Sequence, residues 1–400
     1  MPAANSTRSD QRAASETAIL DAAVDLYSRS GPDGTSLRAV AGSAGLTHAL
    51  VARYFGSKQG LVSAVEDRLA VEVRAVAGDI ACSSNAAFVQ LLTSAREHPA
   101  WVRLMIRSGL GDLDGSVVPE VAAQRCAAAG GVDHRSRLCG YAAVSLLLGW
   151  WSWEGFVIPA LQLDRVSHRR QDDAVAAAVM SLLRAATGPE PRLVPRPLAP
   201  AIAAPETPPV RSARDALLVA AVELFAERGP ASVSLRDVAR HAGVNHGLIH
   251  RHFGSKDDLL AEAIDVGSGS LVSGASAPQG FDIDDVVHAM YHGSPSPRTI
   301  ARALVDDIAI GQVRPRYPVL RGLLALVRQV PADARPPGLA DPRAAVAAAT
   351  SLVVGSVLWG PGLRVAFGLH DDDAVESAVA DLGRWLMGAQ SAGPTRASTR

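Results

Sequence analysis

The chain carries one short stretch twice, without an insertion or a deletion between the copies. Residues 36–58 read SLRAVAGSAGLTHALVARYFGSK, and residues 234–256, at an offset of 198, read SLRDVARHAGVNHGLIHRHFGSK. Copies that align in this way predict the same local structure at two places in the chain. Because 400 residues exceed the usual size of one domain, we expect two structural units joined in tandem.

Each copy has the pattern of two short helices joined by a glycine turn. Apolar residues at i, i+3, i+4 and i+7 from Leu37 predict a short helix with one buried face, and Ser36 precedes it as an N-cap. Gly45 ends this helix, because a tight turn often needs a positive φ that glycine adopts without steric cost. Thr47 begins a second short helix that ends at Gly56. This order predicts a helix-turn-helix, whose second helix docks in the major groove of DNA.

The second copy predicts the same elements with different caps. Ser234 and Asp237 have the spacing of a capping box, with Asp in place of the usual Glu. Gly243 takes the turn position, and Asn245 is the N-cap of the second helix. The outer faces of the two second helices differ in composition, so the two copies are expected to read different DNA sequences.

Each copy resembles the DNA-binding domain of the tetracycline-repressor (TetR) family of bacterial transcription regulators. The resemblance extends from AILDAAVDLYSRSGPDGTS and ALLVAAVELFAERGPASVS, through LRAVAGSAGL and LRDVARHAGV, to YFGSKQGL and HFGSKDDL. It implies an all-α fold, sequence-specific DNA binding, usually by a homodimer with two identical heads, and a helical regulatory domain that binds a small-molecule effector. The family often has a phosphate-contacting Tyr on the recognition helix, where this chain has Ala52 and His250.

Charged side chains on the second helices are candidate DNA contacts. Arg53 and Arg251 can hold a phosphate or pair with guanine, although a solvated surface charge is the alternative. Lys58 and Lys256 follow a Ser cap and suit phosphate binding beside helix N-terminal amides, or else serve no partner. The predicted DNA-contacting residues are Ser36, Thr47, His48, Ala49, Arg53, Tyr54 and Lys58 in the first copy, and Ser234, Asn245, His246, Gly247, His250, Arg251, His252 and Lys256 in the second.

Two histidines of the second copy also have a spacing that can chelate zinc. His246 and His250 are four residues apart, but the sequence places no third ligand beside them and no acid between them. We therefore expect them to face DNA, and we expect no metal site. The chain also contains no GxSxG, Walker or GxGxxG motif, so we expect neither an enzyme nor a cofactor.

Composition and local pattern divide the chain further. The 48% of apolar residues, with 4% aromatic, and the abundance of alanine favour helices. In the first regulatory region Trp101 and Met105 are candidate ligand contacts, with ordinary core packing as the alternative. We expect a flexible arm before residue 15 and a loop over residues 266–280. The predicted domains are residues 12–74 and 210–266 (DNA-binding heads), 75–186 and 267–388 (regulatory domains), and 187–209 (a proline-rich linker).

Charge and cysteine content bear on location. The net charge of −1 means that any DNA-binding potential must come from basic residues gathered on one face. Three cysteines without a CxxC pair are typical of a reduced, cytoplasmic compartment. Residues 141–161 have the length of a membrane span, but Glu154 lies inside them, so we expect a buried helix followed by a turn.

Together these features predict a tandem, ligand-responsive transcriptional repressor that binds a double-stranded DNA operator. One chain could form an intramolecular pseudo-dimer that reads an asymmetric site, or two chains could form a homodimer. The alternative function is a ligand-sensing or protein-binding module whose DNA affinity has decayed, which Ala52 and the near-zero net charge would suit.

Overall fold

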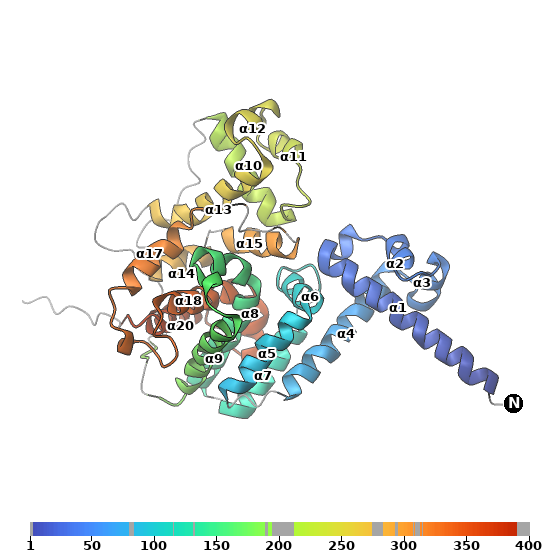
Figure 1. Cartoon of the computed structure of the whole chain (residues 1–400), viewed down its shortest axis with the longest axis horizontal. Coiled ribbons are helices and arrows are strands. Elements are labelled where there is room, and N and C mark those ends of the chain that lie inside the picture. The colour runs from blue at the N-terminus through green and yellow to red at the C-terminus, as the bar shows by residue number, and fades with distance from the viewer. Residues whose placement is uncertain are drawn as a thin grey trace, which may run out of the picture.

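The computed structural model describes residues 3–79, 84–114, 116–130, 133–188, 191–193, 212–273, 283–292, 295–306, 308, 313 and 315–389. Within these ranges every regular element is a helix, and no strand occurs. The all-α fold expected from the sequence is confirmed. Most of the proposed linker, residues 187–209, lies outside the described residues. Figure 1 shows a helical body from which two smaller helical heads project.

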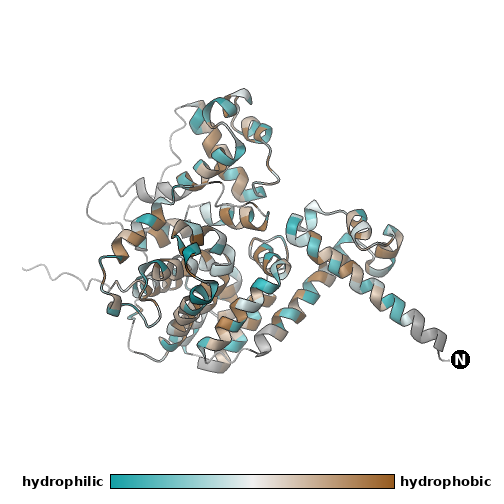
Figure 2. Ribbon diagram, in the orientation of Figure 1, coloured by the Kyte–Doolittle hydropathy of each residue, from teal (hydrophilic) through white to brown (hydrophobic). Residues whose placement is uncertain are grey.

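The two heads are built from the same series of helices. Head one contains α1 (Ala3–Gly34), α2 (Leu37–Ser43) and α3 (His48–Phe55), and α4 (Lys58–Asp79) connects it to the body. Head two contains α10 (Ala213–Arg228), α11 (Leu235–His241) and α12 (Gly247–His252), with α13 (Lys256–Ser273) as its connection. Figure 2 shows hydrophilic and hydrophobic residues alternating around these helices, as amphipathic helices require.

The cores of the two heads match position by position. Five side chains with no exposed surface close each core, and each has its counterpart 198 residues later: Ile19 and Leu217, Tyr27 and Phe225, Val40 and Val238, Val51 and Ile249, Leu61 and Leu259. All five pairs keep an apolar or aromatic side chain of similar size. The two heads therefore fold on one packing plan, as the repeat predicts.

Two expectations about chain flexibility are wrong. The segment before residue 15 is not an arm, because α1 begins at Ala3. From Ala3 to Ser30 the sequence contains no Gly or Pro, and residues 3–14 include four Ala and two Arg, which are good helix formers. Arg12 also pairs with Glu16 one turn later. The expected loop from residue 266 is also partly helical, since α13 continues to Ser273, while residues 274–282 lie outside the described ranges.

The body combines the remaining helices of both units. The first unit contributes α5 (Asn85–Glu97), α6 (Pro99–Gly109), α7 (Val117–Gly130), α8 (His134–Ala160) and α9 (His168–Arg184), with a short 3-10 turn at Leu163–Arg165. The second unit contributes α14 (Ile283–His292), α15 (Ser296–Val305), α17 (Pro318–Val327), α18 (Pro342–Leu358), α19 (Gly360–Phe367) and α20 (Asp372–Leu386), with a 3-10 turn at Ala332–Ala334. Helices α8, α9, α18 and α20 pack together at the centre.

Helices α8 and α18 approach each other so closely that only small residues fit between them. A Cβ atom added to Gly149 would lie 1.8 Å from the backbone oxygen of Ser351, and one added to Gly355 would lie 1.8 Å from that of Ser145. The two contacts are equivalent, because Ser145 and Gly149 correspond to Ser351 and Gly355 at one offset of 206. The two units thus meet through matching faces of matching helices.

Helix α8 is the buried helix expected over residues 141–161, and the turn follows it at Leu161. It runs unbroken to Ala160, past Gly155, and most of its residues between Leu138 and Val157 are buried. The corresponding chain in the second unit breaks at Trp359, where α18 ends and α19 begins. Pro361 stands where the first unit has Gly155, and a proline inside a helix lacks a donor and clashes with the carbonyl four residues earlier.

In the part of the chain that the structure describes, no single helix has both the length and the apolar composition needed to cross a bilayer. Helices α18 and α19 meet those criteria only when taken together, and they are bent by 84° at their junction.

Candidate nucleic-acid interface and effector cavity

Helix α3 is held against head one by its inner face and leaves its outer face in solvent. Val51 is fully buried, and the glycines at either end, Gly45 and Gly56, adopt φ angles of 67° and 73°. These left-handed conformations favour glycine and allow a short helix to be presented between two sharp corners. The side chains predicted to contact DNA from this helix lie as follows: Thr47, His48, Ala49 and Arg53 are exposed, and Tyr54 is half-buried.

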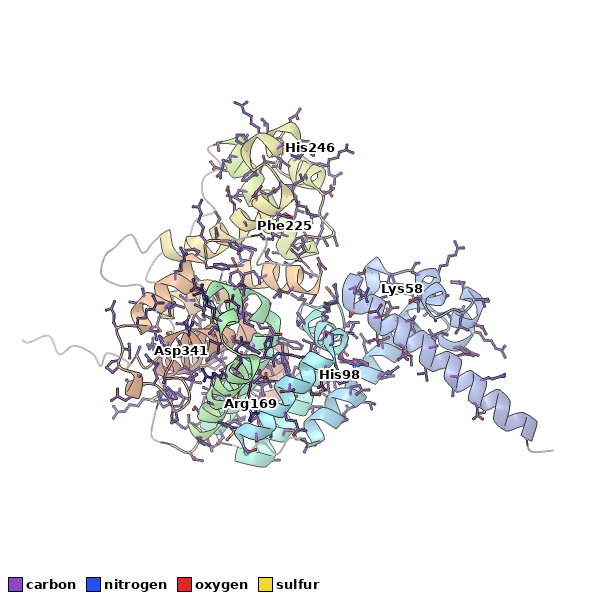
Figure 3. All side chains as sticks on the ribbon, in the orientation of Figure 1. Lys58, His98, Arg169, Phe225, His246 and Asp341 are labelled. Carbon is purple, nitrogen blue, oxygen red and sulfur yellow. The ribbon has the colours of Figure 1, made fainter. Side chains whose placement is uncertain are left out.

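Helix α12 is presented in the same way in head two. Ile249 is its buried anchor, and Gly243 and Gly254 have φ angles of 66° and 81°. The N-cap is His246 rather than the predicted Asn245, but the Asn245 side chain accepts a hydrogen bond from the Gly247 backbone N–H at 2.8 Å at the start of the helix. Figure 3 shows His246 toward the outer end of head two. Of the predicted contacts, Asn245, Gly247, His250 and Arg251 are exposed, and His246 and His252 are half-buried.

The imidazoles of α12 are organised among themselves. The rings of His246 and His250 meet edge to face, with their centroids 5.5 Å apart, and His250 Nδ1 lies 3.0 Å from the Gly254 carbonyl oxygen. Head one has no such pair, since the equivalent residues are His48 and Ala52. The two recognition helices thus present different chemistry on a common backbone plan.

The serines and lysines among the predicted DNA contacts already make contacts within their heads or are partly buried there. Ser36 accepts a hydrogen bond from the Ala39 N–H, and Ser234 forms the predicted capping box with Asp237. Lys58 donates from Nζ to the Asp33 carbonyl at 3.3 Å, and burial lowers the pKa of Lys256. Contact of these four residues with DNA remains a prediction.

A network of two arginines and two aspartates joins both heads to the body. Arg107 follows head one: its Nε donates to the Ser28 carbonyl at 3.1 Å, and its guanidinium pairs with Asp306 of the second unit at 3.2 Å. Arg302 follows head two: its Nε donates to the Ala226 carbonyl at 3.0 Å, and it pairs with Asp112 of the first unit at 3.2 Å.

The network is close to symmetric. Ser28 and Ala226 are equivalent positions at the offset of 198, so each arginine holds the first helix of its own head. Each aspartate then pairs with the arginine of the opposite unit. Asp306 additionally accepts from the Ala231 N–H in head two, and its burial raises its pKa. A movement of one head would therefore change the ion pairs that hold the other head.

An apolar cavity of about 210 Å³ lies in the first regulatory domain. Both residues predicted to contact a ligand, Trp101 and Met105, line it. Phe88, Leu147 and Trp151 also contribute to the walls, and the indole N–H of Trp151 is buried without a hydrogen-bond partner. The acidic and basic side chains among the lining residues are Glu72, His98 and Arg125, and all three are exposed. Figure 3 places His98 in the body, away from the outer end of either head.

Helix α4 reaches from this cavity into head one. Leu69, Glu72 and Val73 line the cavity, whereas Leu61 and Val65, nearer the start of the helix, belong to the core of the head. A side chain or ligand that displaces α4 at the cavity therefore acts on the same rigid element that supports α3.

Two heads that each present a short outward helix after a glycine corner define the chain as a helix-turn-helix protein. A family model described as "Bacterial regulatory proteins, tetR family" matches residues 19–65 and 217–263. HTH-type transcriptional repressor Rv3405c of Mycobacterium tuberculosis and HTH-type transcriptional regulator Mb3439c of Mycobacterium bovis are each 40% identical to this chain over 157 residues, 39% of this chain and 78% of the relative.

HTH-type transcriptional regulator BetI of Agrobacterium fabrum is 45% identical over 51 residues, 13% of this chain and 25% of the relative. The chain belongs to the tetR family of bacterial regulatory proteins, and it is a DNA-binding transcription regulator. Because the same 157 residues are 78% of Rv3405c but 39% of this chain, that relative is half as long as this one.

Two groups of side chains escaped the sequence analysis. The arginine–aspartate network joins residues from both units, and the only hint in the sequence is that an Arg precedes an Asp at similar places, Arg107 with Asp112 and Arg302 with Asp306. A second group, formed by two histidines and a glutamate in the second regulatory domain, is described below.

Proposed function

We propose that this protein is a ligand-responsive transcriptional repressor in which the two units of one chain act as a pseudo-dimer and read an asymmetric DNA site. The observation that carries the proposal is the contact of α8 with α18. It joins equivalent helices at equivalent glycines, Gly149 and Gly355, within a single chain. A two-fold dimer interface has this self-matching character.

The unlike recognition helices support an asymmetric site. On equal backbone plans, head one presents His48, Ala49 and Arg53, whereas head two presents His246, His250 and Arg251. Base contacts depend on which donors and acceptors reach the groove edges, so the two half-sites should differ in sequence. Since both heads belong to one chain, binding of the second half-site is intramolecular once the first is bound.

The arginine–aspartate network supports a fixed spacing of the heads. Arg107 and Arg302 hold the ends of equivalent helices, and their partners Asp306 and Asp112 cross between the units. A change in this network would alter the distance between the recognition helices, and grooves one helical turn apart accept only a narrow range of distances.

The cavity supports control by an apolar effector. Its walls are aromatic and aliphatic, and the unpartnered Trp151 N–H offers one donor to an acceptor such as a carbonyl or hydroxyl oxygen. An effector that binds better when α4 is displaced would weaken DNA binding, with a coupling of about 1–3 kcal/mol.

The test combines selection of bound sequences from random DNA at fixed salt with a solution mass of the free protein. We expect a defined, non-palindromic motif, steep salt dependence, and the mass of one chain. A stable dimer of chains that protects a perfect palindrome would overturn the pseudo-dimer. A second candidate function, a sensing module with little DNA affinity, is favoured by Ala52 at the position of the phosphate-contacting Tyr. Weak binding without any motif would support that alternative.

A further inference from the structure

Two histidines and a glutamate meet between α14 and α20 in the second regulatory domain. His288 and His292 lie one turn apart on α14, and Glu376 lies on α20. His288 Nδ1 is 3.3 Å from Glu376 Oε1, and His292 Nε2 is 2.8 Å from Glu376 Oε2. One nitrogen or oxygen atom from each of the three side chains lies within 4.8 Å of the other two.

The carboxylate is buried with little to balance it. The Glu376 side chain is 6% exposed, and its Oε1 and the facing His288 Nδ1 are both buried without a hydrogen bond. A buried carboxylate is costly unless a cation or several donors stabilise it. Neutral imidazoles supply only one N–H each, so this site lacks a permanent positive charge.

The first unit pairs a buried carboxylate with a permanent cation. Asp172 on α9 forms a two-pronged ion pair with Arg96 of α5. In the second unit, Glu376 on α20 faces imidazoles on α14 instead of a guanidinium. Imidazole nitrogen differs from guanidinium in being able to coordinate a metal ion.

We propose that His288, His292 and Glu376 bind one Zn²⁺ ion. Two histidines at i and i+4 with a carboxylate from a second helix form a set of three ligands that zinc accepts. Imidazole nitrogen favours zinc over the oxygen-seeking Mg²⁺ and Ca²⁺. Zinc–ligand bonds of ~2.0–2.1 Å separate tetrahedral ligand atoms by roughly 3.4 Å, so the present separations require only side-chain adjustment.

The site is open on one side. The His292 side chain is 51% exposed, which leaves solvent access for a water as the fourth ligand. The bound ion would join α14 to α20, and α20 packs on α18 at the centre of the body. Zinc would therefore stiffen the second regulatory domain, as the Arg96–Asp172 pair stiffens the first. This site does not depend on the proposed effector or on the pseudo-dimer.

The test is a zinc titration of the untagged full chain after treatment with a chelator. We expect one Zn²⁺ per chain with a Kd in the micromolar range or tighter, and a visible Co²⁺ spectrum of tetrahedral type. His292→Ala and Glu376→Gln should each weaken binding at least tenfold. His246→Ala, in the other histidine pair, and His98→Ala, at the cavity, are the matched controls and should bind as the unmodified protein does.

Stability supplies the second readout. Saturating Zn²⁺ should raise the Tm of the unmodified protein and of both controls, but not that of His292→Ala. If Glu376→Gln fails to fold, the exposed His292 still decides the matter, because its truncation removes little buried surface. Two results would each overturn the proposal. One is an unchanged zinc affinity in His292→Ala, and the other is no zinc bound to micromolar unmodified protein in a 100-fold excess of Zn²⁺.

Discussion

Val51 and Ile249 anchor the two recognition helices, Gly45 and Gly243 turn the chain before them, and the five fully buried core positions of the heads match in pairs. The bodies behind the heads are less alike. Helix α8 is continuous where its counterpart breaks into α18 and α19. The first body contains the Arg96–Asp172 ion pair, whereas the second contains histidines around Glu376. Insertion into a DNA groove requires both heads to have the same shape. The interior of a regulatory domain can be packed in many ways, provided that the central helices still meet.

The largest expected effect is at the crossing of α8 and α18, where the two bodies are alike. Gly149→Ala and Gly355→Ala should each lower the free energy of unfolding by about 3–5 kcal/mol, because the added Cβ would press on backbone of the facing helix. Gly42→Ala is the control: this helical glycine has nothing within 4 Å of the added atom, so it should gain about 0.5–1 kcal/mol. Urea unfolding measures all three. Equal, small effects would show that the units are not pressed together at these glycines.

The arginine–aspartate network allows the two junctions to be compared directly. Arg107→Gln should cost about 2–4 kcal/mol of stability, since it strands Asp306 and two carbonyls in a buried place. Arg302→Gln should cost less, because that side chain is 14% exposed against 5% for Arg107. Urea unfolding measures the loss of stability in each variant, and DNA footprints of the two variants show which head has lost its contacts. Stability equal to that of the unmodified protein in both variants would remove the network as a coupling element.

The outward arginines test whether the heads read different sequences. Arg53→Ala and Arg251→Ala should each weaken DNA binding by about 1–3 kcal/mol and relax sequence preference in one half-site only. The affected half should differ between the two variants. Competition binding against operators mutated in one half at a time provides the measurement, with the exposed Arg169 of α9 truncated as a control away from the heads. Loss of preference in both halves from one substitution would contradict independent readout.

The smallest expected effect is a pH dependence of stability that comes from the body of the first unit. Burial raises the pKa of Glu154 from 4.5 to about 7, while its counterpart in the second unit, 206 residues later, is Gly360. Below pH 4.5 the carboxyl is protonated whether folded or not. Between pH 4.5 and about 7 the unfolded chain ionises this group while the folded protein keeps it protonated, so stability falls as pH rises across this range and levels off above it.

Glu154→Gln should lack this fall. Between pH 5 and 8 the unmodified protein should lose roughly 1–2 kcal/mol more than the variant, the side chain being only partly buried. Chemical unfolding at several pH values measures the difference. Parallel profiles for the two proteins would assign the carboxyl an ordinary pKa.

Short-range patterns predicted the heads well, because caps, glycine corners and apolar spacing are encoded by neighbouring residues: the Ser234–Asp237 capping box and the buried Val51 follow from a few positions. Helix ends in the bodies were harder. Gly155 does not end α8, since packing on the second unit outweighs its weak propensity, whereas Pro361 does break the corresponding helix. Trp101 and Met105 were candidates because the family has an effector-binding domain here, and both line the cavity; their contact with a ligand stays a prediction.

Sites assembled from distant segments could not be predicted. His288 and His292 show a ligand spacing in the sequence, but Glu376 is 84 residues from His292, and only the packing of α14 on α20 brings it close. The same holds for Arg107 and Asp306, which are 199 residues apart. Sequence separation hides such groups because nothing local specifies the partner.

The glycine crossing of α8 and α18 has a consequence for regulation in the cell. In the proposed pseudo-dimer the two partners are encoded in one polypeptide, so they are made in equal amounts and cannot dissociate on dilution. Operator occupancy would then rise with the first power of protein concentration, without the threshold of a two-chain assembly. Exchange of subunits with related regulators would also be excluded, which keeps each pair of unlike readers together from synthesis onward.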